Sequence, residues 1–367
     1  VVLITTKKGN NNGKARLSLN LKSGFEAPSK RLDFLNSEQF LDFRDDLEAN
    51  DASGFQIDRS NFMENGELIY TDWQDESFSA GAINDVGFSV AGGGESSNYY
   101  ISSNYYKQDG ILVGSGFERF NLRGNSEFKI GKLTLSQTLG LSQSETQENE
   151  YFGFEAATAP ILRLNNPNNL GGFEAPEVDV AGFGGINNYA LASLEDNLDT
   201  RRNLLGNLSA AYEIFDGLTA KISLGAEYTN GFKSTFRPAF FMSSTDARFN
   251  DNPENDLTHV RSEFLRTQIE PTLTYQKESG DHNIGVVLGT GRVVTNFDIL
   301  ATYVGGLPSN EISTVGAAGT TNILGSAGSS EVDALISVFG RINYAFQNKY
   351  LLTATIRQDE SSKFSED

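Results

Sequence analysis

Apolar and polar residues alternate along many short stretches of this chain. Between residues 118 and 129, Phe120, Leu122 and Phe128 lie at even positions, while the odd positions hold only charged or amide side chains. A period of two over about ten residues indicates a β-strand with one apolar and one polar face. The 218–228 segment repeats the pattern, with Leu, Ala, Ile and Tyr on one side and Thr, Lys, Ser, Gly and Glu on the other.

Eleven segments of this kind predict eleven strands. They lie near residues 14–24, 83–92, 97–107, 118–129, 133–142, 203–214, 218–229, 263–276, 282–293, 334–346 and 350–359. Residues 36–50 have a helical pattern instead, and Asn36 or Ser37 is the expected cap.

The connections between the predicted strands alternate in length. Short turns lie at 92–97, 130–132, 215–217, 277–282 and 347–349, and long connections lie at 25–82, 143–202, 230–262 and 294–333, with 108–117 as a brief exception. Outer-membrane barrels separate short periplasmic turns from long extracellular loops in this way, and strands of about 9–11 residues cross their hydrocarbon layer. The sequence therefore predicts an all-β fold, a transmembrane antiparallel β-barrel with about 11 strands in this chain.

Aromatic residues gather near the predicted strand ends. Tyr99 and Tyr100 lie at the short-turn end of one strand, and Tyr105 and Tyr106 lie at its long-loop end. Barrels carry aromatic girdles at both membrane interfaces, so we interpret these pairs as girdle residues. The same interpretation covers Tyr212, Phe215, Tyr228, Tyr275, Tyr344, Phe346 and Tyr350. The alternative is that they are ordinary strand aromatics of a soluble β-protein.

Strand parity and composition add three constraints. Known single-chain bacterial barrels have even strand numbers, and an unpaired sheet edge cannot face lipid, so we expect further strands after Asp367. Acidic residues exceed basic ones, 48 to 29, which argues against a nucleic-acid partner. The chain has no cysteine, so it can form neither a disulfide nor a thiolate metal site.

Several segments resemble SusC/RagA-like TonB-dependent outer-membrane transporters. "VVLITTKKG" (1–9) is similar to the end of the plug domain of that family, and "TDWQDESF" (71–78), residues 88–125 and "KYLLTATIRQDESSKF" (349–364) are similar to blocks of its barrel. "AATAPILRLNNPNN" (156–169) is similar to part of a long external loop.

The resemblance implies a 22-stranded, plugged barrel in the bacterial outer membrane. Residues 1–13 would be the end of the plug domain and a linker, and residues 14–367 the first half of the barrel. The implied partners are TonB, through an N-terminal region absent from this chain, a SusD-like surface lipoprotein, and outer-membrane lipid. The implied cargo is a glycan oligosaccharide, with a peptide next.

No residue constellation indicates an enzyme, a cofactor or a metal site. His259 and His282 lie far apart in sequence and are expected near opposite membrane faces. The acidic stretch at 251–259 lacks the oxygen spacing and central glycine of a calcium loop. The glycine turns at 114–119 and 182–188 do not follow a buried parallel strand, so nucleotide binding is not indicated.

Two sets of residues are candidates for contact with solutes. Charged residues expected to line the lumen are Arg119, Arg123, Glu127, Arg266, Glu270, Arg341 and Arg357. They either follow a solute path or belong to a hydrated wall that touches the plug. Loop aromatics expected to contact substrate or partner are Trp73, Tyr151, Phe152 and Phe154, which either stack on a sugar ring or pack within the loops.

The resemblance implies active, TonB-dependent import of a nutrient across the outer membrane. One alternative is a siderophore or cobalamin receptor with the same kind of barrel. Another is a surface adhesin or structural β-protein without transport.

Overall fold

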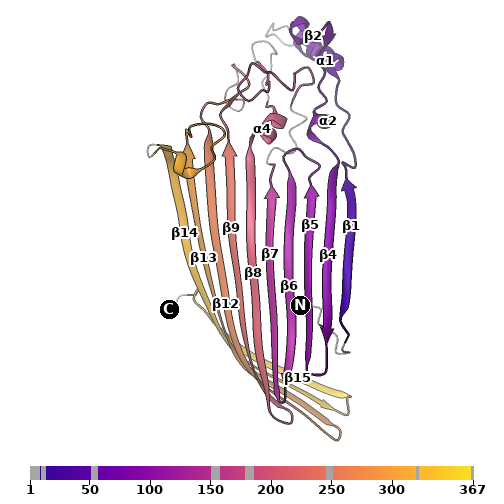
Figure 1. Ribbon diagram of the computed structural model, residues 1–367, viewed down its shortest axis with the longest axis vertical. Coiled ribbons are helices and arrows are strands. Elements are labelled where there is room, and N and C mark those ends of the chain that lie inside the picture. Colours follow the sequence, from indigo (N-terminus) through magenta and orange to yellow (C-terminus); the bar gives the residue numbers. More distant parts are fainter. Residues whose placement is uncertain are drawn as a thin grey trace.

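The computed structural model describes residue 9 and residues 14–50, 57–149, 158–177, 186–244, 251–319 and 322–364. Its main feature is a tall, curved sheet of eleven strands, as the alternation predicted (Figure 1). The strands are β1 (Arg16–Glu26), β4 (Gly81–Gly93), β5 (Ser97–Asp109), β6 (Gly116–Ile130), β7 (Leu133–Gln147), β8 (Asp196–Phe215), β9 (Leu218–Arg237), β12 (Asp256–Ser279), β13 (His282–Gly305), β14 (Ile323–Phe346) and β15 (Tyr350–Ser361). Each pairs antiparallel with its neighbour in this order, from β1 to β15.

The pairing register separates the two faces of the sheet. Leu19 lies opposite Phe88, and the same cross-strand row continues to Leu122 and Leu141. Leu19 is 64% exposed, Leu122 37% and Leu141 42%, so no part of the chain that the structure describes covers this apolar row. An uncovered apolar row is typical of the lipid-facing wall of a membrane barrel.

The two tyrosine pairs in β5 divide between the faces, because neighbouring residues of a strand point to opposite sides. Tyr105 lies opposite Phe120 on the apolar face, and Tyr99 shares that face. Tyr100 and Tyr106 lie on the other face, where the hydroxyl of Tyr106 donates to Gln108 Oε1 at 2.8 Å. The prediction that whole Tyr-Tyr pairs belong to the girdles is therefore wrong for one member of each pair.

The strands in the second half of the chain are longer than predicted. β8 and β9 have 20 residues each, and β12, β13 and β14 have 24 each. Much of the expected long connections at 230–262 and 294–333 is therefore strand. Alternation identified only the part of these strands next to the tight turns, because it is not visible at their loop ends.

The connections separate by length at the two ends of the sheet (Figure 1). Tight turns of two or three residues join strands at one end. At the other end lie the first loop (27–80), second loop (110–115), third loop (148–195), fourth loop (238–255) and fifth loop (306–322). This confirms the predicted asymmetry. Residues 1–13 lie outside the described residues except for Gly9, so their assignment to a plug and linker stays a prediction.

The loops carry the helices and two small hairpins. These elements are α1 (Ser37–Asn50), η1 (Arg59–Phe62), β2 (Met63–Glu64), β3 (Glu67–Leu68), α2 (Trp73–Ser77), α4 (Asn188–Leu194), β10 (Phe240–Phe241), β11 (Asp251–Asn252) and η3 (Val315–Ala317). Among the described residues, no helix is long and apolar enough to cross a membrane.

Asn36 caps α1, and Ser37 does not. The Asn36 side chain accepts from the backbone N–H of Gln39 at 2.9 Å, and the Gln39 side chain accepts from the N–H of Asn36 at 3.0 Å, which forms a reciprocal cap. Ser37 is buried, and its hydroxyl donates instead to the carbonyl of Ile69 at 2.5 Å. Of the two residues that the sequence offered as a cap, Asn36 is the helix cap, and Ser37 links two parts of the first loop.

Candidate functional site

The described loops pack against one another as one layer over the end of the sheet. Apolar side chains of the first and third loops share a buried cluster that includes Leu41, Trp73 and Ile161. A second cluster joins the third and fourth loops through Leu191 and Phe240. The fourth and fifth loops are joined by hydrogen bonds, since the Asn310 amide group bonds to both the N–H and the carbonyl of Ala239. The loop layer is therefore a folded surface, which the sequence did not reveal.

Backbone and side-chain hydrogen bonds fix the first loop to the third loop. The N–H of Thr71 donates to the carbonyl of Pro160 at 2.8 Å, and its hydroxyl donates to the carbonyl of Leu162 at 2.6 Å. The indole of Trp73 donates to the carbonyl of Ala159 at 3.0 Å. These bonds join segments more than 80 residues apart in sequence.

Trp73 lies in the shared cluster of the two loops. It is 5% exposed, and its neighbours include Leu41 and Phe62. Its burial favours the packing alternative over stacking on a sugar ring, but Trp73 also lines the cavity described next. A direct contact with substrate stays a prediction. The other three loop candidates, Tyr151, Phe152 and Phe154, lie outside the described residues.

A cavity of about 570 Å³ opens between the first and third loops. Its walls come from the segment before α1, from α1 itself, from residues 70–74 and from residues 158–160. Several apolar side chains at this cavity are exposed, including Phe34, Phe43 and Tyr70. Exposed apolar side chains grouped around a concave site on a water-facing loop indicate a binding surface.

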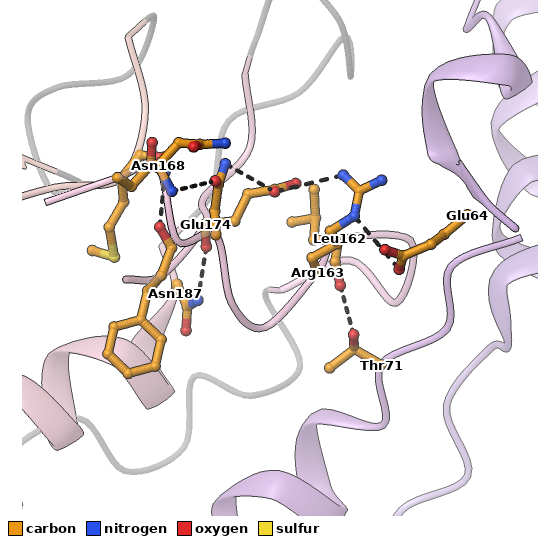
Figure 2. A network of polar contacts seen from close by, with 11 residues as sticks. Glu64, Thr71, Leu162, Arg163, Asn168, Glu174 and Asn187 are labelled. Carbon is orange, nitrogen blue, oxygen red and sulfur yellow. Dashed lines mark hydrogen bonds and ion pairs between the residues drawn. The ribbon is translucent and has the colours of Figure 1, made fainter. Parts of the chain in front are cut away.

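A polar network beside the cavity holds the third loop in shape (Figure 2). The guanidinium of Arg163 lies 3.7 Å from a carboxylate oxygen of Glu64 in the first loop and 3.7 Å from one of Glu174. The amide of Asn166 donates to Glu174 Oε2 at 3.4 Å, and that of Asn187 donates to the backbone carbonyl of Glu174 at 2.7 Å. The network ties both loops to the start of α4.

Burial raises the pKa of the Glu174 carboxyl above its ordinary value, and the positive charge of Arg163 partly opposes this shift. Among the described residues, no group of three or more His, Asp or Glu side chains is arranged to hold a metal ion.

The seven charged residues expected to line the lumen all lie on one face of the sheet. The register places Arg119, Arg123 and Glu127 opposite Tyr106, Ser102 and Asn98 of β5. The same face continues through β7, β8 and β9 to Arg266 and Glu270. Arg341 and Arg357 share this face through β13, β14 and β15. It is the face opposite the apolar row. Whether these residues guide a solute stays a prediction.

Local partners fix some of these charged side chains. The guanidinium of Arg357 donates to both carboxylate oxygens of Asp359 at 2.9 Å and to the Ser337 hydroxyl at 3.0 Å. Arg119 lies over the rings of Tyr106 and Phe117, with its guanidinium carbon 5.9 and 5.8 Å from their centroids. Such contacts favour the interpretation of a hydrated barrel wall for these two residues.

The chain is similar to known receptors along its whole length. It is 28% identical over 385 residues to the TonB-dependent receptor P3 of Formosa agariphila, and the match covers 100% of this chain and 35% of that protein. It is 25% identical over 400 residues to the TonB-dependent receptor SusC of Bacteroides thetaiotaomicron, with 100% and 37% covered. The chain thus spans about a third of the length of these relatives. No protein-family model matches it.

Solved structures of the RagAB peptide transporter have the same fold. One superposes with a TM-score of 0.79 at 20% sequence identity, covering 98% of this chain and 44% of that one. A second, of the RagAB peptide importer in a closed state, gives a TM-score of 0.80. The sheet of this chain therefore matches part of an outer-membrane receptor barrel, as the sequence resemblance implied.

Proposed function

We propose that this SusC/RagA-like chain belongs to a receptor that imports a nutrient across the bacterial outer membrane with energy delivered through TonB. The similarity to TonB-dependent receptors along the whole chain supports this function. The observation that carries it is the division of the molecule into an uncovered apolar wall, tight turns at one end and a folded loop layer at the other. A transporter needs such a division because cargo must be captured outside before it passes a plugged lumen.

The proposed receptor works with a SusD-like surface lipoprotein that closes over the loop layer. Two lines of support are the similarity to SusC and the similarity to structures described as RagAB. The cargo is a glycan oligosaccharide or a peptide. Capture takes place on the loop layer, chiefly on the first and third loops, where the cavity lies. The relatives are named as receptors and transporters rather than as enzymes, in agreement with the sequence interpretation.

The experiment that tests this function is uptake of labelled oligosaccharides and peptides by cells that carry the complete receptor. Uptake should stop when a protonophore collapses the proton gradient, and it should also stop when TonB is removed. Persistence of uptake after the gradient collapses would show a passive pore. Uptake of a ferric siderophore or cobalamin alone would instead support the alternative receptor class, and absence of any uptake would support a structural protein.

A further inference from the structure

Five of the residues that line the cavity between the first and third loops are aromatic. Phe34 precedes α1, Phe40 and Phe43 lie on α1, and Tyr70 and Trp73 come from the end of the first loop. Phe43 is 52% exposed and Tyr70 58%, although both lie in a loop that faces water. Large apolar side chains that remain uncovered around a cavity of about 570 Å³ can bury apolar groups of a ligand.

Most polar side chains at this cavity are already bonded within the loops. The side-chain amide of Gln74 bonds to both the N–H and the carbonyl of Leu32, at 2.9 and 2.7 Å. Thr71 donates to Leu162, and Thr158 donates to the carbonyl of Ile186 at 2.8 Å. A sugar ring can stack its C–H face on an aromatic side chain, but the hydroxyl groups at its rim need hydrogen-bond partners. With Gln74, Thr71 and Thr158 engaged, the Asp33 carboxylate and the Tyr70 hydroxyl are the groups of this lining that make no hydrogen bond among the described residues.

The charge at the cavity is negative. Asp33 lines it and makes no ion pair with the residues that the structure describes, and Asp72 lines it while capping α2. The positive residue in the lining is Arg44, whose guanidinium lies 3.9 Å from the carboxylate of Glu48. The surrounding first loop has thirteen Asp and Glu residues and four Lys and Arg residues, a formal charge of -9. Such a surface attracts cationic ligands and repels anionic ones.

We propose that this cavity binds a cargo peptide by a large apolar side chain, with a neighbouring Lys or Arg of the peptide held by Asp33. This inference rests on the proposed import function and specifies the cargo class of the same loop layer. Burial of the apolar side chain against Phe43 and Tyr70 gives affinity, and the carboxylate selects a basic neighbour. An acidic glycan is disfavoured at this site by charge, and a neutral glycan has no positive group for the carboxylate to select.

The test is binding to the complete receptor with its partner lipoprotein, purified in detergent, by isothermal titration calorimetry. The probes are the peptides Ala-Phe-Lys-Ala, Ala-Phe-Glu-Ala and Ala-Ser-Lys-Ala, and the neutral glycan maltohexaose. The first peptide should bind about tenfold tighter than either of the others, because each lacks one of the two recognised groups. Maltohexaose should not compete with it.

Two variants, each with a matched control, test whether the peptide binds in this cavity. Phe43→Ala should weaken binding of Ala-Phe-Lys-Ala about tenfold, whereas Leu47→Ala, an exposed residue one turn further along α1 and outside the cavity lining, should not. Asp33→Asn should remove the preference for Lys over Glu, whereas Glu38→Gln should keep it. Peptide binding that is unchanged by Phe43→Ala, or tighter binding of maltohexaose than of every peptide, would overturn the inference. Because binding is measured without a membrane or an energy source, its failure is distinguishable from failure of TonB-dependent uptake.

Discussion

Single positions in the strands face either lipid or water, and a step of one residue changes the environment completely. Leu122 is 37% exposed on the apolar face, and Asn121 beside it pairs with Asn104 on the polar face. The same alternation separates Leu224 from Ser223. The free energy needed to place a charged side chain in a strand therefore depends on which face of the sheet it points to, as much as on its depth in the membrane.

Arginine at Leu122 should destabilise the complete barrel by about 2–4 kcal/mol, the cost of a basic side chain near the middle of a lipid-facing wall. Arginine at Asn121 should be tolerated, because that side chain faces water. The measurement is the fraction of each variant that runs as the folded, heat-modifiable form on gels. Equal folding of Leu122→Arg and Asn121→Arg would contradict the assignment of the faces.

Glu174 makes the packing of the third loop depend on pH. Its pKa is raised above the ordinary 4.5, chiefly by burial, so the protonated form is favoured in the folded loop. Glu174 therefore stabilises the folded third loop fully below the ordinary pKa of its carboxyl. This stabilisation is lost as the pH rises through the raised pKa. We expect hydrogen exchange in residues 158–177, relative to Glu174→Gln at the same pH, to become faster as the pH rises above the ordinary pKa of 4.5.

Comparison with Glu174→Gln at each pH removes the intrinsic pH dependence of amide exchange. The control is Glu67→Gln, which changes an exposed carboxylate of β3 in the first loop. The control protein should follow the wild type across the whole range. If wild type and Glu174→Gln exchange in parallel, Glu174 does not govern the loop.

At the scale of elements, the loops behave as a folded layer that rests on extended strand ends. β9 and β12 remain paired up to Arg237 and Asp256, beyond the part that alternation identified. The first and third loops then share one apolar cluster and several backbone hydrogen bonds. Either loop depends on the other for its shape, because each contributes only part of the cluster.

Trp73→Ala should loosen both loops without unfolding the sheet. Replacing a buried Trp by Ala typically costs about 3–5 kcal/mol, and here the indole bond to Ala159 is lost as well. Limited proteolysis should therefore cleave the third loop faster, although the changed residue lies in the first loop. The heat-modifiable band should remain. Leu47→Ala is the matched control, and an equal rate of cleavage in both variants would show that Trp73 does not connect the loops.

At the scale of the whole molecule, the described sheet has two open edges. β1 and β15 each pair on one side only within the described residues. Unpaired backbone groups at a lipid-exposed edge cost several kcal/mol each, so an open sheet of this kind is unstable in a bilayer. Closure therefore needs further strands next to β1 and β15.

Residues 1–367 produced alone should fail to form a heat-modifiable, protease-resistant barrel in lipid vesicles, whereas the complete receptor should form one. The reason is the pair of open edges. The measurement is gel mobility with and without heating, together with cross-linking to detect pairing between copies. A compact, heat-modifiable monomer of the short chain would show that the edges close on each other.

The sequence by itself determined the number of strands, the two faces of the sheet and the division between tight turns and loops. These properties depend on the environment of each successive residue, and lipid on one side imposes a period of two that is visible along the chain. The same reasoning identified α1, because the helix and its cap are local as well. It placed the seven charged residues on one face. It wrongly assigned both members of each Tyr-Tyr pair to the aromatic girdles, although one member of each pair lies on the polar face.

Only the tertiary structure decided the length of the upper strands and the arrangement of the loops. Above the membrane no apolar face is required, so residues 230–237 and 256–262 pair as strands without a visible alternation. Trp73 is buried by residues 159–162, and the cavity beside it is built from three separate segments. Contacts between segments so distant in sequence depend on packing and hydrogen bonding in three dimensions, and no local pattern in the chain records them.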